Sequence, residues 1–124
     1  VVTVGTGIVR VASIYLPNGN PLGTEKFPYK LAWMERLRRH AAGLLAHEEP
    51  LVLAGDYNVI PEDRDCSDPA AWAGDALARP ESRAAFRALL AEGFTDALRV
   101  VHTEVRGWDK PSDHVPVVGA FALG

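Results

Sequence analysis

The beginning of the chain is rich in apolar residues of the kinds that favour β-strands. Residues 1–4 and 8–16 are rich in β-branched side chains, and the turn sequence Gly5-Thr6-Gly7 separates them. This pattern predicts a β-hairpin. Residues 18–23 then form a dense run of turn-forming residues, so we expect the chain to leave the sheet there as a surface loop.

A helical period follows the loop. From Lys30 to about His47 the apolar residues recur at steps of three and four, which predicts an amphipathic helix. The continuous apolar run at residues 51–55 predicts a strand buried on both faces. A strand, a helix and a strand in this order indicate an α/β layered fold.

The rest of the chain contains further helix starts. A proline follows Asp68 and another stands at position 80, and each predicts the first turn of a helix. The second of these helices has an apolar stripe formed by Phe86, Leu89 and Leu90. Residues 95–98 predict a short helix and residues 115–121 a final strand.

The composition suits one globular domain with a single core, because 48% of the 124 residues are hydrophobic. No apolar run approaches the roughly 20 residues that span a bilayer. Cys66 is the single cysteine and forms no internal disulfide, and the first residues lack the pattern of a secretory signal. We therefore expect a cytoplasmic protein. The net charge of −3 counts against DNA binding by phosphate neutralisation.

Asp56 and Asn58 follow the apolar run directly. Residues two apart in an extended segment project from the same face, so both side chains are able to converge on a phosphate or an attacking water. The alternative interpretation is a solvated turn, because Gly-Asp and Asp-x-Asn sequences are common in turns.

The sequence Ser112-Asp113-His114 stands between two prolines, shortly before the last predicted strand. A carboxylate binds a hard cation, and a neighbouring imidazole donates a hydrogen bond to a phosphoryl oxygen. The alternative is a helix cap or a surface polar pair.

Tyr15 stands at the last position of its predicted strand, where its hydroxyl is able to reach outward to a phosphate; the alternative is a core tyrosine. We expect His40, His47 and His102 to be surface residues. Serine-hydrolase, phosphate-loop, dinucleotide and paired-cysteine motifs are absent from the sequence. The remaining polar groups suit metal-assisted hydrolysis of a phosphate ester.

Three segments carry a family resemblance. Tyr-Leu-Pro-Asn-Gly at 15–19, Leu-Ala-Gly-Asp-Tyr-Asn at 53–58 and Ser-Asp-His at 112–114 resemble, in the same order, signature segments of the exodeoxyribonuclease III family. Residues 23–30 and the helix around Trp33 resemble that family rather than its relatives that cleave sphingomyelin or inositol phosphates. The resemblance implies part of a four-layer α/β/β/α sandwich, the endonuclease/exonuclease/phosphatase fold. Residues 1–124 would then be a single partial domain that lacks the N-terminal half and has an internal gap near Val105 and Arg106.

The resemblance also implies an activity: magnesium-dependent 3′-5′ exonuclease action and abasic-site incision in DNA repair, with manganese as a substitute metal. The expected partner is duplex DNA with abasic sites or 3′ ends. We expect no membrane association, and we expect the full-length parent to be a monomer. The implied catalytic residues are Tyr15, Asp56, Asn58 and His114. The implied metal ligands are Asp56, Asn58 and Asp113, and the implied DNA contacts are Asn18 and His114.

Two other functions remain open. The chain is either a nuclease, a catalytically inactive truncated remnant, or a phosphodiesterase acting on a phosphorylated lipid or small molecule. The last of these agrees better with the acidic net charge.

Overall fold

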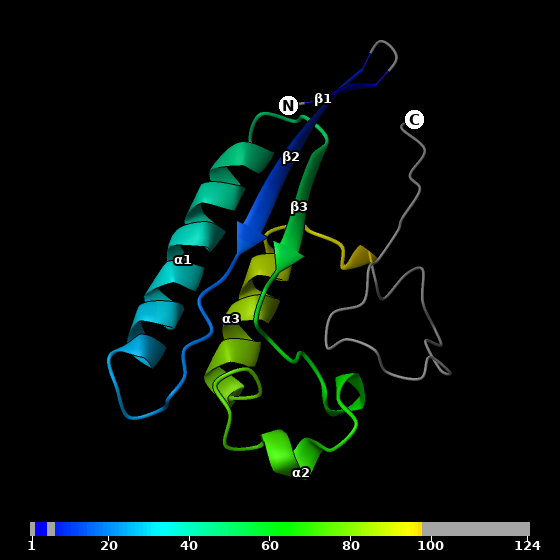
Figure 1. Cartoon of the computed structure of the whole chain (residues 1–124). Helices are drawn as coiled ribbons and strands as arrows, with labels where there is room; N and C mark the ends of the chain where they lie inside the picture. Colours follow the sequence, from blue (N-terminus) through cyan, green and yellow to red (C-terminus); the bar gives the residue numbers. More distant parts are fainter. Residues whose placement is uncertain (1, 5–6, 98–124) are drawn as a thin grey trace. The chain divides into compact units, whose positions relative to one another are not determined.

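The computed structural model describes residues 2–4 and 7–97 (Figure 1). The chain divides into two compact units, Val1–Gly93 and Phe94–Gly124. Every element below belongs to the first unit, and only residues 94–97 of the second are described. The strand expected at 115–121 and the end of the helix expected at 95–98 lie outside the described residues, and a single partial domain stays a prediction.

The sheet has three strands in the order β1-β2-β3. Strand β1 (Val2–Val4) pairs antiparallel with β2 (Gly7–Tyr15), so the predicted hairpin is confirmed. Strand β3 (Leu51–Asp56) pairs parallel with β2, from Arg10 opposite Leu51 to Tyr15 opposite Asp56. Because a parallel pair needs a crossover, the chain passes through a helix between the two strands, and the predicted α/β class is confirmed.

The crossover helix α1 (Lys26–Leu45) begins four residues before the predicted start at Lys30. Pro28 is tolerated because the first-turn backbone N–H groups have no intrahelical acceptor. The Thr24 hydroxyl accepts a hydrogen bond from the Lys26 backbone N–H at 3.3 Å, which satisfies one of those groups. No described helix is long and apolar enough to cross a membrane.

The two proline signals mark real helix starts. In α2 (Pro69–Trp72) the Asp68 side chain accepts a hydrogen bond from the backbone N–H of Ala71 at 3.1 Å. Helix α3 (Pro80–Ala91) begins with its proline, and its apolar stripe buries Leu89 while Phe86 and Leu90 are half-buried. A short 3-10 turn, η1 (Asp63–Asp65), lies between β3 and α2.

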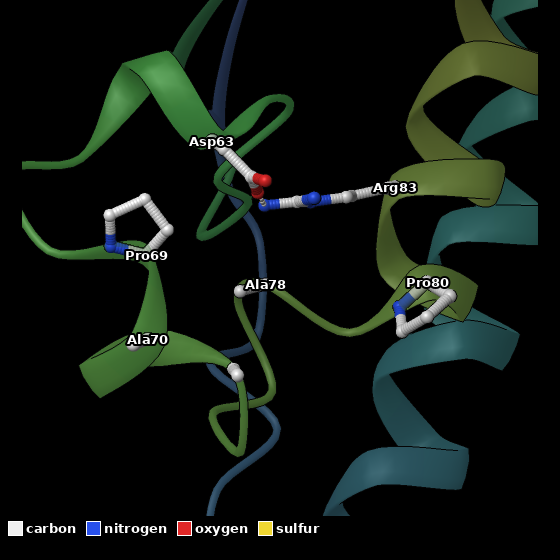
Figure 2. A pocket seen from close by; sticks show the side chains of 7 residues that line it. Asp63, Pro69, Ala70, Ala78, Pro80 and Arg83 are labelled. Carbon is white, nitrogen blue, oxygen red and sulfur yellow. Dashed lines mark hydrogen bonds and ion pairs between the residues drawn. The ribbon is translucent and has the colours of Figure 1, made fainter.

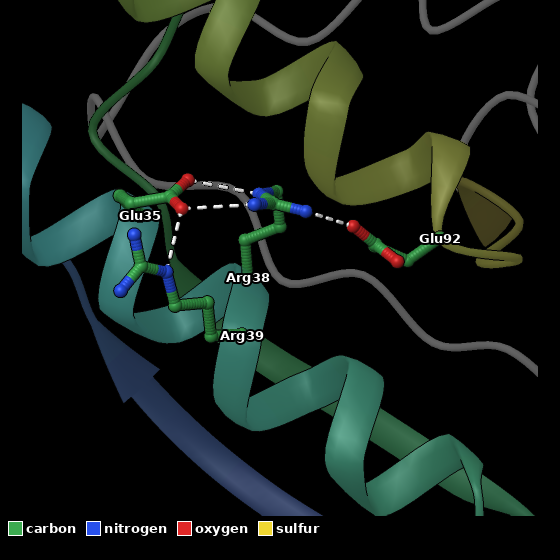
Figure 3. A network of polar contacts seen from close by, with 4 residues as sticks. All are labelled: Glu35, Arg38, Arg39 and Glu92. Carbon is green, nitrogen blue, oxygen red and sulfur yellow. Dashed lines mark hydrogen bonds and ion pairs between the residues drawn. The ribbon is translucent and has the colours of Figure 1, made fainter.

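A charged cluster links α1 to the end of α3 (Figure 3). Arg38 forms ion pairs with Glu35 on its own helix, at 2.8 Å, and with Glu92, the residue that follows α3. Hydrogen bonds from Arg38 and Arg39 lower the pKa of Glu35 to about 2. This carboxylate therefore stays charged at more acidic pH than an ordinary glutamate, and its bonds to both arginines persist there.

The core lies against one face of the sheet, so the expectation that β3 is buried on both faces is wrong for the described structure. Val52 is 36% exposed, and on the same face of β2 its partner Val11 is 45% exposed and Tyr15 75% exposed. Side chains alternate along a strand, so covering one side leaves every second residue from Val11 to Tyr15 open. The buried apolar residues are Val9, Ile14, Leu16, Met34, Ala41, Ala76, Ala78 and Leu89.

Two glycines give a matched test of this packing. A Cβ at Gly55, which has φ +138°, would collide with the backbone carbonyl of Ile14 on β2, whereas a Cβ at Gly43 in α1 meets nothing within 4 Å. We expect Gly55→Ala to lower the free energy of unfolding by more than about 2 kcal/mol through backbone strain and strand separation. Gly43→Ala should raise it by about 0.5–1 kcal/mol, because alanine favours the helix.

Urea denaturation of the two variants beside the wild type measures both changes. Equal stability of the two variants would contradict the close approach of β2 and β3 at Gly55.

Candidate active site at the carboxyl ends of β2 and β3

Tyr15 and Asp56 lie side by side at the carboxyl ends of their strands. They are the last residues of β2 and β3 and are paired in the parallel register, and the Leu16 N–H donates to the Asp56 carbonyl at 2.9 Å just beyond them. Tyr15 is 75% exposed, so it is not a core residue. Ligands of α/β sheets bind at the carboxyl ends of parallel strands, which makes this edge the candidate site.

A tight turn joins Asp56 to Asn58. The Asn58 backbone N–H donates to Asp56 Oδ1 at 2.8 Å, and Asn58 has φ 46°, in the left-handed region. The expectation that both residues share one face of an extended segment is therefore wrong. Asparagine and aspartate adopt such turns because their short side chains bond to nearby backbone. The turn interpretation is correct for the backbone, and the turn holds the Asp56 carboxylate against the backbone of Asn58.

Two side-chain amides join the loops that follow β2 and β3. Asn58 Nδ2 donates to the Leu16 carbonyl at 2.7 Å, and Asn18 Nδ2 lies 3.4 Å from Asn58 Oδ1. Asn18 Oδ1 in turn accepts a hydrogen bond from the Asn20 N–H at 3.1 Å. The structure thus brings Asn18, Asn58 and Asp56 to the end of the strand that carries Tyr15.

Lys30 is the residue of this region that the sequence did not reveal. Its side chain is fully buried, with 0% of its surface exposed. Its Nζ donates to three backbone carbonyls: Asn18 at 3.0 Å, Asn58 at 2.6 Å and Ala76 at 3.4 Å. An ammonium has three N–H donors, so three carbonyls satisfy it, which is what makes its burial possible.

The burial of Lys30 has an electrostatic cost. Desolvation lowers the pKa of Lys30 from its ordinary 10.5 to about 8. The negative charges of Asp75 and Asp56 act in the other direction and raise this pKa by less. One signal was present in the sequence: Lys30 shares the buried stripe of α1 with Met34 and Ala41. A lysine at such a position either carries its charge out to water or has internal partners.

The segment before α3 is fastened to the same loops. Asn20 Nδ2 donates to both carboxylate oxygens of Asp75, at 3.0 and 3.1 Å, and the Ala76 N–H donates to Asn20 Oδ1 at 3.1 Å. The buried Ser82 hydroxyl donates to the Ala76 carbonyl at 2.6 Å. Three chain segments therefore meet around the ammonium of Lys30.

The described residues supply part of a magnesium site. No group of three acidic, histidine or cysteine side chains comes together among them. Asp56 and Asn58 offer a carboxylate and an amide oxygen, the hard donors that magnesium prefers. Asp113 and His114 lie outside the described residues, so their approach to Asp56 stays a prediction. His40 and His47 are exposed, as predicted, and His102 is not described.

A separate hollow of about 360 Å³ lies beside α2 (Figure 2). Across it Arg83 Nη2 bonds to Asp63 Oδ1 at 2.8 Å, while its Nε donates to the Ile60 carbonyl at 2.9 Å. None of the predicted site residues lines it, so it is not the candidate active site. Its lining residues are Asp63, Pro69, Ala70, Ala73, Ala78, Pro80 and Arg83.

The sequence of the chain matches one protein family. Residues 1–114 match the endonuclease/exonuclease/phosphatase family. The chain belongs to this family. Membership confirms the family predicted from the three signature segments and the α/β fold class, of which the described residues form one part.

Relatives of the chain include an exodeoxyribonuclease, a 3′ phosphatase and an AP endonuclease. The chain is 32% identical over 107 residues to an exodeoxyribonuclease of Bacillus subtilis, covering 86% of this chain and 42% of that protein. A 3′ phosphatase from Neisseria bound to a product DNA hairpin is 38% identical with a TM-score of 0.73, covering 77% of this chain and 37% of the other. An AP endonuclease from Archaeoglobus fulgidus is 34% identical with a TM-score of 0.70, covering 74% and 36%. The chain thus spans about two fifths of the length of these family members.

The titration of Lys30 predicts a pH dependence of stability. The folded-state pKa of about 8 lies below the ordinary 10.5, so between these values the unfolded chain binds more protons. Stability that depends on Lys30 therefore rises with pH in that window, by at most about 1.4 kcal/mol per pH unit. In urea denaturation at pH 7.5, 8.5 and 9.5, the free energy of unfolding of the wild type should rise with pH relative to that of Lys30→Met.

The same substitution at the exposed Lys26, one turn earlier on α1, is the control. A difference between wild type and Lys30→Met that stays constant from pH 7.5 to 9.5 would contradict the burial of a charged Lys30.

Proposed function

We propose that this protein hydrolyses DNA phosphodiesters with the help of magnesium, acting as a 3′-5′ exonuclease and as an endonuclease at abasic sites in DNA repair. The observation that carries the proposal is the parallel register that sets Tyr15 beside Asp56, with the amides of Asn18 and Asn58 joined next to them. A phenol, a carboxylate and two amides at one strand edge suit the positioning of a phosphate and a water.

Each of these side chains has a proposed role. Asp56 activates the attacking water, and its contact with the Asn58 backbone at 2.8 Å holds the carboxylate in place for this. Asn58 binds the phosphate or the metal shell. Tyr15 places its exposed phenol near the scissile group, and Asn18 contacts the DNA. His114 donates a hydrogen bond to the phosphoryl oxygen and also contacts DNA.

The proposed metal ligands are Asp56, Asn58 and Asp113. Bound magnesium, or manganese in its place, would stabilise the negative charge that develops on the phosphoryl oxygens. The described part of this set agrees with the preference of magnesium for carboxylate and amide oxygens.

The proposed substrate is duplex DNA with abasic sites or 3′ ends. The names of the relatives support it: an exodeoxyribonuclease, an AP endonuclease and a 3′ phosphatase bound to a DNA hairpin. We propose that the protein acts in the cytoplasm, away from membranes, as part of a monomeric enzyme.

The test is cleavage of end-labelled duplex DNA that carries one abasic site or a recessed 3′ end. The wild type should cleave with magnesium and stop on chelation. Asp56→Asn and His114→Ala should each lower the rate by roughly 100- to 1000-fold, because each loses a group that acts in the transition state.

Two matched controls accompany these variants. Asp68→Asn keeps a residue that caps α2 about as well as aspartate, and His40→Ala removes an exposed histidine. Both should cleave like the wild type. Full activity of Asp56→Asn and His114→Ala would refute the assigned roles.

Two other outcomes would overturn the activity itself. Hydrolysis of a phosphorylated lipid or a small phosphodiester without DNA cleavage would assign a different substrate. Absence of cleavage, together with no saturable manganese binding in calorimetric titration, would identify an inactive chain.

A further inference from the structure

The ammonium of Lys30 connects three segments that are far apart in the sequence. Its acceptors belong to the loop after β2, at Asn18, to the loop after β3, at Asn58, and to the segment before α3, at Ala76. The first two segments carry the amides that meet at the candidate site. Lys30 therefore lies behind the site and bonds to the backbone on which the site is built.

The backbone around Lys30 is shaped to admit its side chain. Gly19, with φ +90°, lies so close that a Cβ there would be 2.7 Å from the Lys30 Cδ. Any other residue at position 19 would compete with the lysine stem for this space. The narrow space beside Gly19 and the three carbonyl acceptors together hold the ammonium at one position.

No side chain of similar shape replaces this group. Methionine fills a comparable volume but has no donor, so it would leave the partly buried carbonyls of Asn18 and Asn58, and the buried carbonyl of Ala76, without this partner. An unpaired buried carbonyl is unfavourable and moves toward water or another donor. Loss of the ammonium therefore lets the two loops move relative to each other.

We propose that Lys30 is a positioning residue: by bonding to the carbonyls of Asn18 and Asn58, it sets the separation of the two loops so that their side-chain amides reach one phosphate group. The consequence for catalysis rests on the proposed function. The loop geometry rests only on the contacts of Lys30.

The kinetic signature is a fall in kcat with little change in KM. Misplacement of a positioned group by about 1 Å costs on the order of 100-fold in rate. Affinity for duplex DNA comes mainly from phosphate contacts spread along the duplex, which Lys30, being buried, does not make. We expect Lys30→Met to lower kcat roughly 10- to 100-fold, and to change KM by less than about threefold.

Nuclear magnetic resonance of the full chain measures the loop geometry without any activity. In Lys30→Met the side-chain NH₂ resonances of Asn18 and Asn58 should shift and exchange faster with water. In Lys26→Met, the same change at an exposed position of α1, they should stay where they are in the wild type. Unchanged Asn18 and Asn58 resonances in Lys30→Met would overturn the proposal.

A rescue experiment separates positioning from general stability. Cys66 is the single cysteine, so in a Cys66→Ser background Lys30→Cys is the only thiol. Alkylation of the unfolded chain with 2-bromoethylamine, followed by refolding, rebuilds a lysine-like ammonium at position 30. The controls are the Cys66→Ser parent and the unalkylated Lys30→Cys variant, which are unfolded and refolded in the same way.

The alkylated chain should recover the wild-type Asn18 and Asn58 resonances and most of kcat, whereas the unalkylated chain recovers neither. If circular dichroism shows both to be fully folded at the assay temperature and kcat is equal in both, Lys30 has only a structural role. If the wild type cleaves no DNA, the proposed function fails, and the two asparagine resonances alone decide the role of Lys30.

Discussion

The buried ammonium of Lys30 is the interaction on which the rest of the described structure depends. One positive charge with three backbone partners lies where three segments converge: the ends of β2 and β3 and the approach to α3. Burying it lowers its pKa, and this cost is tolerated because every N–H group has an acceptor. The contacts between Asn20 and Asp75 and the buried Ser82 hydroxyl fasten the same segments further.

The parallel pairing of β2 and β3 is the second constraint. It places Tyr15 and Asp56 next to each other although 40 residues separate them in the chain. Gly55 permits the two backbones to approach just before that point. The site therefore combines a rigid part, formed by the strand ends, with a part held by side-chain and backbone hydrogen bonds in the loops.

Much of the fold followed from local signals in the sequence. The glycine turn, the helical period and the prolines at positions 69 and 80 act on neighbouring residues, so they predicted the hairpin and the helices. The open face of β3 depends on packing against segments distant in the sequence, and it was missed. The early start of α1 was also missed, although the contact of Thr24 with Lys26 is local, because the apolar period begins only at Lys30. The turn at Asp56 and Asn58 was one of two interpretations, because the same residues also suit an extended segment. The candidate site shows the same division: Tyr15 at its strand end was predictable, whereas Lys30 depends on three carbonyls that only the folded chain assembles.

The lysine anchor recognises main-chain oxygen atoms and not side chains. The bonds from Lys30 to positions 18 and 76 therefore do not depend on which side chains stand there. Replacing Asn18 by another polar residue would alter what its loop offers to a ligand while leaving the bond from Lys30 in place. The scaffold is in this sense permissive: a new specificity at these loops could evolve without inventing a new way of holding them.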